Sequence, residues 1–326
     1  MDPPKTSTTP GEASAVTEPE NRSGAIAAPD PPAGTRPDTV RLGGEKGVWF
    51  DRITEAAAAA YVMAALDAGR GGWVVTSNLD HLVRARRDPD FRRMTRDADL
   101  VVADGAPLVW ASVLQGTPLP ERVAGSSLVW TLAEAAATRG RSVYLLGGDP
   151  GTAEEAGRVL EARYPGLRVV GTWCPPRGFE TDLPHMQAMA ESLRSSGADL
   201  VYVALGSPKQ EKLIEQLREV LPGAWWMGVG ISLSFICGRV RRAPRWVQRL
   251  GLEWVHRMAQ EPRRLARRYL VDGIPFALVL LCSSLVRRFS TPDAERTRRP
   301  IKRAAAARTA GVEGTHGTEP VREGGP

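Results

Sequence analysis

A polar hexapeptide that directly follows an apolar run is the part of this sequence whose residue types most clearly suggest chemistry. Gly206-Ser207-Pro208-Lys209-Gln210-Glu211 comes after Leu200–Leu205, a run typical of a buried strand. Gly206 lets the chain turn, and Pro208 suits the first turn of a helix, where its missing N–H costs nothing. Because ligands of open α/β sheets bind outside the carboxyl ends of the strands, we expect a polar, phosphorylated ligand at this turn. The side chains expected to contact it are those of Pro208, Lys209, Gln210 and Glu211.

Hydroxyl, amide and carboxylate groups follow two further predicted strands. Thr76, Ser77 and Asn78 could hydrogen-bond a sugar or a nucleotide, although Ser77 or Asn78 could equally cap the helix that follows. Asp104 could act as a general base towards a hydroxyl nucleophile, or it could cap the helix that Pro107 opens. The sequence pattern alone leaves both pairs of alternatives open.

An arginine and a glycine-rich turn supply further candidates for anion binding. Arg122 could hold a phosphate with two parallel hydrogen bonds, or it could form a local salt bridge. Gly147 and Gly148 lie between a predicted strand and a predicted helix, where backbone N–H groups favour anions. This turn lacks the G-x-G-x-x-G spacing of dinucleotide sites, so it is weak evidence for a dinucleotide. A loop at Pro175–Gly178 is expected at the same sheet edge.

Asp97-Ala98-Asp99 has the D-x-D form that binds divalent metal in many sugar transferases. It precedes its predicted strand and lies at the opposite sheet edge from the groups above, so we interpret these acids as solvated turn residues. The four histidines show no metal-ligand spacing, and the three cysteines are far apart and form no C-x-x-C pair. The sequence therefore predicts neither a metal site nor a cofactor.

Apolar runs and helix-like stretches alternate between about Val48 and Phe235, and these elements must position the candidate groups. The predicted strands are Trp73–Thr76, Leu100–Ala103, Ser142–Leu146, Arg168–Thr172, Leu200–Leu205 and Trp225–Val229. The predicted helices are His81–Arg96, Ser127–Arg139, Thr152–Tyr164, Pro184–Ser195 and Pro208–Val220. The alternation predicts an α/β fold, with a Rossmann-like, mainly parallel sheet and helices on both of its faces.

Composition divides the chain into four segments. Residues 1–40 and 291–326 lack apolar periodicity and are predicted to be disordered tails. Residues 41–238 form the predicted Rossmann-like catalytic domain, and residues 239–290 form a basic helical appendage. From Arg239 to Arg303 there are 17 Lys and Arg against 5 Asp and Glu, a balance of +12 in a chain of net charge +6. This asymmetry indicates an anionic partner, for which nucleic acid, acidic lipid and a diphosphate substrate are the candidates.

The appendage ends in about thirteen mostly apolar residues, Ile274–Val286, between arginine-rich flanks. A transmembrane helix needs roughly 20 apolar residues, so this stretch is predicted to be too short to span a bilayer. A basic helix followed by a short apolar one suits a membrane surface instead. Alternatively, Trp246, Trp254 and Tyr269 simply pack a helical appendage whose arginines face water. No apolar signal sequence follows the N-terminus, which favours a cytoplasmic protein held peripherally on the inner face of the membrane.

These separate pieces occur together, and in this order, in one family. The chain resembles the WecG/TagA/CpsF glycosyltransferases from about Phe50 to Tyr269, through motifs that are weak individually but specific as a set. They are Thr76-Ser77-Asn78, Asp104-Gly105-Ala106-Pro107, Glu121-Arg122-Val123-Ala124-Gly125, Leu146-Gly147-Gly148, Gly206-Ser207-Pro208-Lys209-Gln210-Glu211, Gly228-Val229-Gly230, Arg242-Ala243-Pro244-Arg245-Trp246, Gly251-Leu252-Glu253-Trp254, Glu261-Pro262-Arg263-Arg264 and Arg268-Tyr269. The resemblance implies inverting transfer of a sugar, of the N-acetylmannosamine type, from a UDP-sugar to a polyprenyl-diphosphate-linked acceptor, without a D-x-D metal. Cell-surface polysaccharides and teichoic-acid-like polymers are the products that it implies.

The resemblance also implies roles for individual residues. Asp104 matches the family's catalytic aspartate, Thr76 its active-site threonine, and Gln210 the glutamine of its P-K-Q-E motif. Arg242 and Arg257 are the nearest matches to the appendage arginines that close over the donor's diphosphate. The appendage is thereby expected to complete the active site at the membrane surface.

The chain departs from the family where Ile231–Phe235 follow Gly230, a place at which relatives often have another glycine and an aspartate. The identity of the donor sugar is therefore not carried over. Two rival functions stay open, a nucleotide-dependent oxidoreductase on the same sheet and a non-catalytic, membrane-associated scaffold. Nucleic acid is not an expected partner, because the basic residues of the tail are also the family's appendage motif, and a homo-oligomer is left open.

Overall fold

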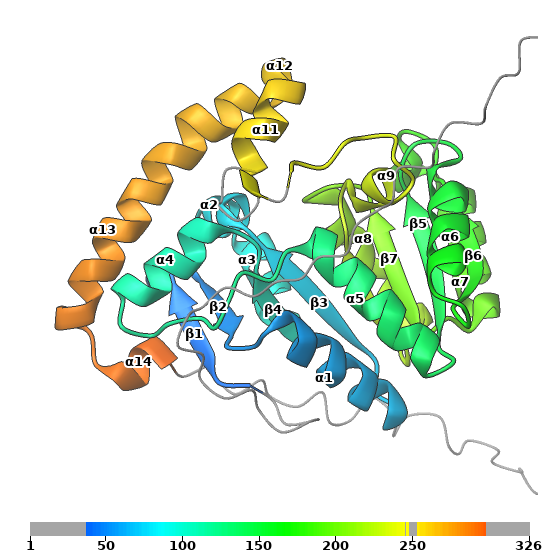
Figure 1. Cartoon of the computed structure of the whole chain (residues 1–326), viewed down its shortest axis with the longest axis horizontal. Helices are drawn as coiled ribbons and strands as arrows, with labels where there is room; N and C mark the ends of the chain where they lie inside the picture. Colours follow the sequence, from blue (N-terminus) through cyan, green and yellow to red (C-terminus); the bar gives the residue numbers. More distant parts are fainter. Residues whose placement is uncertain (1–36, 245, 248–252, 298–326) are drawn as a thin grey trace, which may run out of the picture.

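A parallel six-stranded sheet forms the centre of the computed structural model, which describes residues 37–244, 246–247 and 253–297 (Figure 1). The strand order is β4-β3-β8-β7-β5-β6. The strands span Leu100–Ala103 (β4), Gly72–Ser77 (β3), Trp225–Gly228 (β8), Leu200–Ala204 (β7), Ser142–Gly147 (β5) and Arg168–Trp173 (β6). Each predicted strand is present, which confirms the α/β fold with a parallel sheet.

Helices cover both faces of the sheet, as expected for parallel strands that are buried on both sides. One face is covered by α2 (Leu79–Arg87), α3 (Pro89–Asp97), α7 (Leu183–Ser196) and α8 (Lys209–Leu217), which η2 (Arg218–Val220) extends. The other face is covered by α1 (Glu55–Asp67), α5 (Gly125–Thr138), α6 (Thr152–Arg163) and α9 (Ser232–Ile236). Because both sets bury apolar side chains against the strands, polar groups gather in the loops at the strand ends.

Two helices replace the single helix predicted over His81–Arg96. The chain leaves α2 at Asp88, whose side chain accepts hydrogen bonds from the backbone N–H groups of Asp90 and Phe91. Pro89 then takes the first position of α3, because it lacks the N–H that would continue α2. A cap and a proline therefore divide the helix although the apolar periodicity continues through it.

An antiparallel hairpin precedes the sheet, and the sequence pattern did not predict it. β1 (Thr39–Leu42) pairs with β2 (Val48–Asp51), and β2 lies beside β4. The Asp51 carboxylate accepts a hydrogen bond from the Val101 N–H at 2.7 Å, which ties the hairpin to the edge strand. Because β1 begins at residue 39, the folded domain starts inside the segment predicted to be disordered, while residues 1–36 lie outside the described residues.

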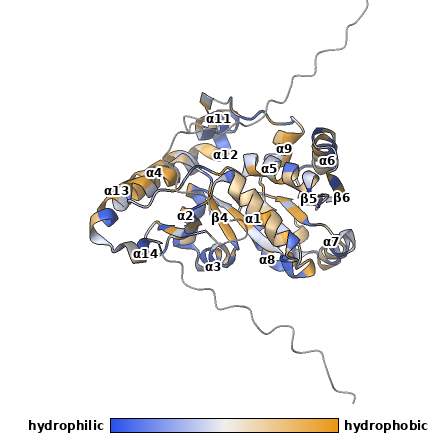
Figure 2. Ribbon diagram, turned by 60° about the horizontal axis from the view of Figure 1, so that its bottom comes forward, coloured by the Kyte–Doolittle hydropathy of each residue, from blue (hydrophilic) through white to orange (hydrophobic). Residues whose placement is uncertain are grey.

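The C-terminal segment is helical, as the sequence predicts. α11 (Glu253–Gln260) is followed by α12 (Pro262–Ala266), the π-helical η3 (Arg267–Gly273) and α13 (Ile274–Ser290). α13 packs along α4 (Ala106–Leu114), and the two helices lie side by side in Figures 1 and 2. Leu280 of α13 is buried in the core that covers one face of the sheet. The short helix α14 (Asp293–Thr297) lies inside the predicted 291–326 tail and corrects that boundary, while residues 298–326 lie outside the described residues.

The apolar C-terminal helix is longer than the sequence pattern suggests. Tyr269–Ser290 forms a helical stretch of 22 residues that contains an 18-residue window with a mean hydropathy of 1.9, so it is long and apolar enough to cross a membrane. The prediction that this stretch is too short is therefore wrong, because the helix continues beyond both limits of Ile274–Val286. Length and composition alone do not distinguish a spanning helix from one that packs along its own protein, as α13 does on α4.

Candidate active site

The carboxyl ends of the parallel strands bring the predicted polar groups to one edge of the sheet. β3 and β4 pair in register up to their last residues, so Thr76 and Asp104 lie close together. β7 and β5 also pair to their ends, which places the Gly206–Glu211 turn next to Gly147. β8 lies between β3 and β7, so the loop that follows β8 has Thr76 and Asp104 on one side and the Gly206–Glu211 turn on the other.

Asp104 is held at the start of α5. Its Oδ2 accepts a hydrogen bond from the Gly125 N–H at 3.3 Å, and its own N–H donates to the Ser77 carbonyl at 2.9 Å. A Cβ on Gly125 would lie 2.8 Å from Thr76 Oγ1, so Asp104, Gly125 and Thr76 are immediate neighbours. α4 begins after Gly105 without a side-chain cap, which removes the capping role left open for Asp104.

Competing charges surround the Asp104 carboxyl. Burial has the largest effect and raises its pKa, while Arg122 lowers it, Glu253 raises it, and the Gly125 N–H and Arg242 lower it. The net result is a pKa above the ordinary value of an aspartate. A carboxylate with a raised pKa accepts a proton more readily than a solvated one, which suits general-base chemistry.

Two arginines and a glutamate complete this side of the site. Glu253, the first residue of α11, accepts hydrogen bonds from Arg122 Nη1 at 3.3 Å and from Arg242 Nε at 3.4 Å, one on each carboxylate oxygen. Arg242 also donates to the Ser126 carbonyl at 3.4 Å and to Ser127 Oγ at 3.1 Å, in the first turn of α5. The C-terminal segment is thereby fixed at the same helix start that holds Asp104.

The structure therefore groups Asp104, Thr76, Arg122 and Arg242, while the part that each plays in binding or catalysis stays a prediction. The salt bridge left open for Arg122 is present, but it is not local, since Glu253 lies 131 residues further along the chain. Arg257 lies in the last turn of α11 and takes no part in the ion pairs of Glu253.

A buried polar network occupies the middle of the edge. Asn78 caps α2 by accepting from the His81 N–H, and its own N–H donates to His81 Nδ1. His81 Nε2 lies 3.3 Å from Glu211 Oε1, which also accepts from Gln210 Nε2 at 2.9 Å. Gln210 Oε1 accepts from the Gly230 N–H at 3.0 Å. The network thus joins the loops that follow β3, β7 and β8.

These contacts show the capping alternative that was left open for Asn78, and they give Gln210 and Glu211 structural roles that the sequence analysis did not assign. Gln210 and Glu211 are only 6% and 4% exposed, and both bond to other protein groups. Burial acts to raise the pKa of Glu211, but hydrogen bonds from His81 and Gln210 and the charge of His81 outweigh it and lower the pKa. In this structure the three side chains shape the loops of the site, with Asn78 as the helix cap.

Lys209 and Pro208 lie at the margin of this network. Lys209 is exposed, and its Nζ lies 2.6 Å from Glu180 Oε1 in the 3-10 turn η1 (Phe179–Thr181). Pro208 directly precedes α8 and holds its N-cap position. Within the Gly206–Glu211 motif, Lys209 is therefore the exposed side chain, Pro208 is half-buried, and Gln210 and Glu211 are buried.

The glycine-rich turn after β5 is contacted by an arginine that the sequence analysis did not assign. Gly147 and Gly148 have φ angles of 99° and 83°, which glycine adopts without strain. Arg239 Nη1 donates to the Pro150 carbonyl at 2.9 Å and to Thr152 Oγ1 at 2.8 Å. Arg239 Nε also donates to Glu155 Oε2 at 2.9 Å, so the guanidinium group at this turn is already paired with a carboxylate of α6.

The two aspartates of the D-x-D sequence have structural partners. Asp97 pairs with Arg93 and Arg96, and Asp99 accepts a hydrogen bond from the Trp73 N–H at 3.0 Å. Asp99 lies in the turn before β4, as predicted, whereas Asp97 is the last residue of α3, and both bind protein groups rather than only solvent. In the described part of the chain, no three His, Cys, Asp or Glu side chains are grouped so that they could hold a metal ion.

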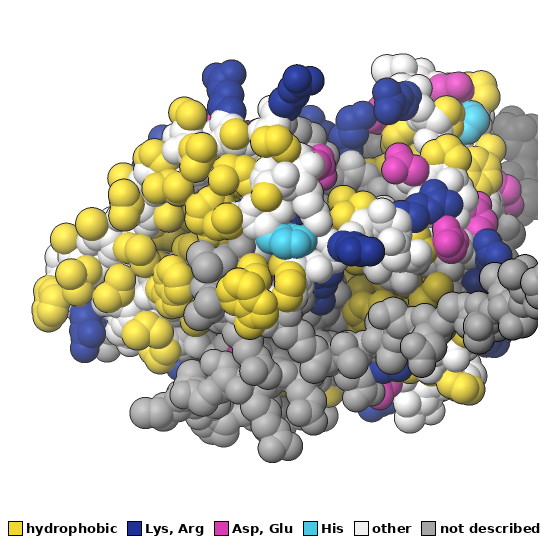
Figure 3. Space-filling model, turned by 45° about the horizontal axis from the view of Figure 1, so that its top comes forward, with side chains coloured by type: hydrophobic (Ala, Val, Ile, Leu, Met, Phe, Trp, Pro, Cys, Tyr) yellow, Lys and Arg dark blue, Asp and Glu magenta, His cyan; other side chains and the backbone are white. Residues whose placement is uncertain are grey.

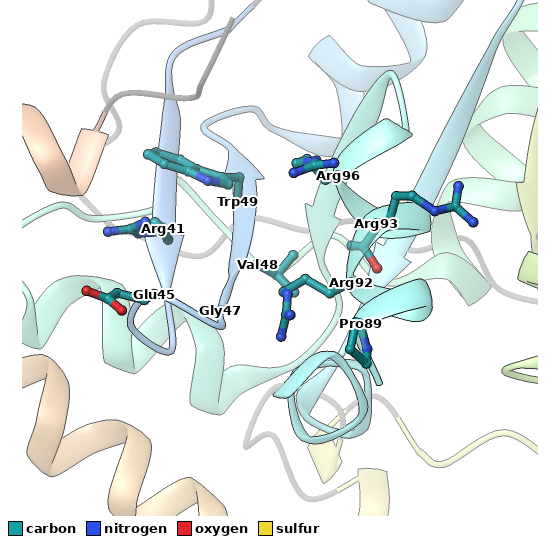
Figure 4. A pocket seen from close by; sticks show the side chains of 10 residues that line it. Arg41, Glu45, Gly47, Val48, Trp49, Pro89, Arg92, Arg93 and Arg96 are labelled. Atoms are coloured by element: carbon teal, nitrogen blue, oxygen red, sulfur yellow. The ribbon is translucent and has the colours of Figure 1, made fainter. Parts of the chain in front are cut away.

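A cavity of about 280 Å³ lies away from this edge, between the hairpin and α3 (Figure 4). It is lined by Arg41, Glu45, Gly47, Val48, Trp49, Pro89, Arg92, Arg93, Thr95 and Arg96. Arg41 stacks over the Trp49 ring, and Arg93 is paired with Asp97 and Glu215. None of the predicted site residues lines this cavity, so we do not assign it to the reaction.

The protein is an α/β protein with a parallel sheet. Its candidate site is a carboxylate beside two arginines, and it lies at the carboxyl edge of the sheet, where such proteins bind ligands. The model of the glycosyl transferase WecG/TagA/CpsF family matches residues 46–290. The chain therefore belongs to that family and is a glycosyltransferase. The match extends beyond Tyr269, where the motifs end, and includes α13.

Three residues of the site were missed by sequence reasoning. Glu253 stands inside one of the family motifs, but nothing in that motif shows that its partners are arginines elsewhere in the chain. His81 was considered only as a metal ligand, whereas it belongs to a buried network. Arg239 has no local signal, because its partners at the glycine-rich turn lie far away in the sequence.

Proposed function

We propose that this protein transfers a sugar from a UDP-sugar to a polyprenyl-diphosphate-linked sugar, with inversion at the anomeric carbon and no required metal. The observation that carries the proposal is Asp104 at the start of α5, flanked by Arg122 and Arg242. Membership of the family supports sugar transfer, and the motifs support this donor and acceptor class. The product would belong to a cell-surface polysaccharide or a teichoic-acid-like polymer.

Asp104 acts as the general base in this proposal. It takes the proton from the acceptor hydroxyl while the hydroxyl oxygen attacks the anomeric carbon. The bond from that carbon to the diphosphate oxygen breaks, and UDP leaves from the opposite face with the electron pair. A single displacement of this kind inverts the anomeric carbon. Thr76 lies beside Asp104 and Gly125, where its hydroxyl can orient the sugar or the acceptor.

Negative charge grows on the departing diphosphate, and cationic groups have to offset it. Arg122 and Arg242 supply two guanidinium groups near Asp104. The donor sugar is left to experiment, because Ile231–Phe235 departs from the family pattern. Most of that segment forms α9, whose Leu233 is buried against the sheet.

Product masses test the proposal directly. The purified protein is incubated with a panel of UDP-sugars and a short-chain polyprenyl-diphosphate glycan. We expect one UDP-sugar to add a single sugar residue to the acceptor. If no member of the panel gives a product while the protein is folded and membrane-bound, the proposed reaction is wrong and the scaffold alternative gains support.

UDP is expected to raise the melting temperature, whereas NAD is expected to leave it unchanged. A ligand that binds only the folded state stabilises it by mass action, so a thermal-shift titration reports binding without turnover. Protection by NAD alone would favour the oxidoreductase alternative on the same sheet.

The acid limb of the kcat/KM profile should lie above the ordinary aspartate pKa. Burial raises the pKa of Asp104, so its carboxyl stays protonated, and inactive as a base, up to a higher pH. Transfer should therefore fall as the pH is lowered through that raised pKa. An acid limb at or below the ordinary aspartate value would contradict the assignment of the base.

A membrane surface is the partner we propose for two neighbouring helices. α4 and α13 pack together, and both keep large apolar side chains exposed. Together with two exposed side chains of η3, they form what we name the α4–α13 face: Trp110 and Val113 of α4, Leu270 and Val271 of η3, and Ile274, Leu278, Val279, Leu285, Val286 and Phe289 of α13. Figure 3 shows hydrophobic side chains gathered over one side of the molecule, with Lys and Arg at the margins.

An apolar face with basic margins suits the surface of an anionic bilayer. Because α13 is packed on α4 along one side, we propose that it lies on the membrane rather than across it. α4 begins directly after Asp104 and Gly105, so docking through this face would bring the lipid-linked acceptor to the catalytic edge. This arrangement supports a peripheral location at a membrane surface.

Replacing Leu278 and Val279 together by Asp should weaken binding to vesicles that contain anionic lipid by roughly tenfold or more. Both side chains are more than half exposed, and burial of each contributes about 1.5–3 kcal/mol. Vesicle flotation measures the change, and Leu183→Asp on α7 is the matched control, since Leu183 is equally exposed but lies outside this face. Equal loss in both variants would show that the α4–α13 face is not the docking surface.

A further inference from the structure

Glu253 is a charged residue of the candidate site whose role the proposed function does not explain. Its two carboxylate oxygens are divided between Arg122, from the loop before α5, and Arg242, from the start of the C-terminal segment. The side chains of the three residues are 16–23% exposed, so the ion pairs are largely shielded from water. A carboxylate is thus held between two guanidinium groups beside Asp104.

This arrangement has the geometry of an occupied anion site. Two guanidinium groups brought together without an anion would repel each other, and the first turn of α5 next to them adds the positive end of a helix. A diphosphate is the kind of anion that paired arginines bind well, because its oxygens accept several parallel hydrogen bonds. Glu253 supplies two such oxygens from within the chain.

We propose that Glu253 is a positioning residue that takes the place of the donor's diphosphate in the donor-free protein and holds Arg122 and Arg242 ready for it. This inference rests on the proposed function only in naming the diphosphate. When the donor binds, its phosphate oxygens replace the Glu253 carboxylate on the two arginines. No covalent step is involved, and the exchange keeps both guanidinium groups paired throughout.

The exchange has a measurable consequence for affinity. Glu253 competes with the incoming anion, so removing its charge should make the anion bind more tightly. We expect Glu253→Gln to lower the Kd for UDP by roughly three- to tenfold, the change produced by loss of one competing ion pair of modest strength. A residue with a merely structural role would instead weaken binding when it is replaced.

A second readout comes from Asp104. The charged groups that act on its carboxyl are Arg122, Glu253 and Arg242, and Glu253 is the one that raises its pKa. Glu253→Gln should therefore shift the acid limb of the kcat/KM profile to lower pH. Loss of packing alone would lower the activity without moving that limb.

The experiment titrates the full-length protein with UDP and, separately, with inorganic pyrophosphate by calorimetry. Glu253→Gln and Glu253→Ala are compared with Asp272→Asn, which removes another ion pair of the C-terminal segment, the one to Arg87. We expect UDP and pyrophosphate to bind more tightly to both Glu253 variants than to the wild type. The affinity of the control variant should not change. The alanine variant decides the matter if the glutamine variant does not fold.

Unchanged or weaker UDP binding in a folded Glu253 variant, with transfer intact in the wild type, overturns this inference and leaves the proposed function standing. If the wild type binds pyrophosphate but not UDP, and Glu253→Gln tightens the binding of pyrophosphate, the donor assignment fails while the role of Glu253 holds. If neither ligand binds the wild type, both proposals fail.

Discussion

Asp104→Asn is expected to reduce sugar transfer by roughly 10²–10⁴-fold, the contribution of one general base. Asparagine has nearly the same shape, and its carbonyl oxygen can still accept from the Gly125 N–H, so the loop between β4 and α4 should keep its structure. UDP binding should change little, because the groups proposed to hold the diphosphate are Arg122 and Arg242. Turnover with a lipid-linked acceptor and calorimetric titration with UDP measure the two quantities separately.

The same substitution is expected to raise the melting temperature. Burial raises the pKa of Asp104, so folding favours the protonated carboxyl, and stability is lost as the pH rises from the ordinary aspartate pKa to the folded one. Above the folded pKa the ionised carboxylate destabilises the fold, and a neutral asparagine removes that cost. A gain in stability with a loss of turnover is typical of groups that are kept for catalysis.

Asp97→Asn is the matched control for the measurements of sugar transfer and UDP binding. It makes the same chemical change in the D-x-D sequence, where the carboxylate pairs with Arg93 and Arg96. Transfer and UDP binding should both stay at the wild-type level. If Asp104→Asn turns over normally, Asp104 is not the base, and if Asp97→Asn loses transfer instead, the rejected metal-binding interpretation has to be reopened.

The parts of the fold that the sequence predicted are those specified by neighbouring residues. Each buried parallel strand is a short apolar run, and the turn after it begins with glycine or a polar residue, so strands and site loops are visible in a few consecutive positions. Parallel strands then share one carboxyl edge, which is why Asp104, Thr76 and Gly147 could be placed together before any coordinates. The hairpin strands each include a charged residue, Arg41 in β1 and Asp51 in β2, so neither forms an uninterrupted apolar run of the kind seen in the equally short β4 and β8.

The parts that were not predicted depend on contacts between distant segments. The sequence of the P-K-Q-E motif does not show whether its glutamate contacts a ligand or a buried histidine. His81 lies against Glu211 only because α2 packs on the sheet. Arg122 and Glu253 are 131 residues apart, so no local pattern reveals their pairing. The length of the C-terminal helix was underestimated because apolar composition was counted without the helical turns that flank it.

Glu211→Ala is expected to reduce stability and transfer together. The Glu211 carboxylate is the partner of both His81 Nε2 and Gln210 Nε2, and the substitution leaves these buried groups without it. Each buried polar group that loses its partner costs about 1–3 kcal/mol. Gln210 also holds the Gly230 N–H, so the disturbance should reach the loop after β8 and lower the rate of transfer. Urea unfolding and turnover measure the two effects.

Lys209→Ala is the control within the same motif, because it removes an exposed ion pair with Glu180 that contributes at most about 1 kcal/mol. A buried carboxylate that supports the fold affects the free energy of unfolding whether or not a ligand is present, whereas a ligand contact affects only binding. Glu211→Ala should therefore unfold at a lower urea concentration than Lys209→Ala even without UDP. If Glu211→Ala keeps full stability but loses UDP binding, Glu211 contacts the donor directly. Its role would then not be to hold the buried network with His81 and Gln210.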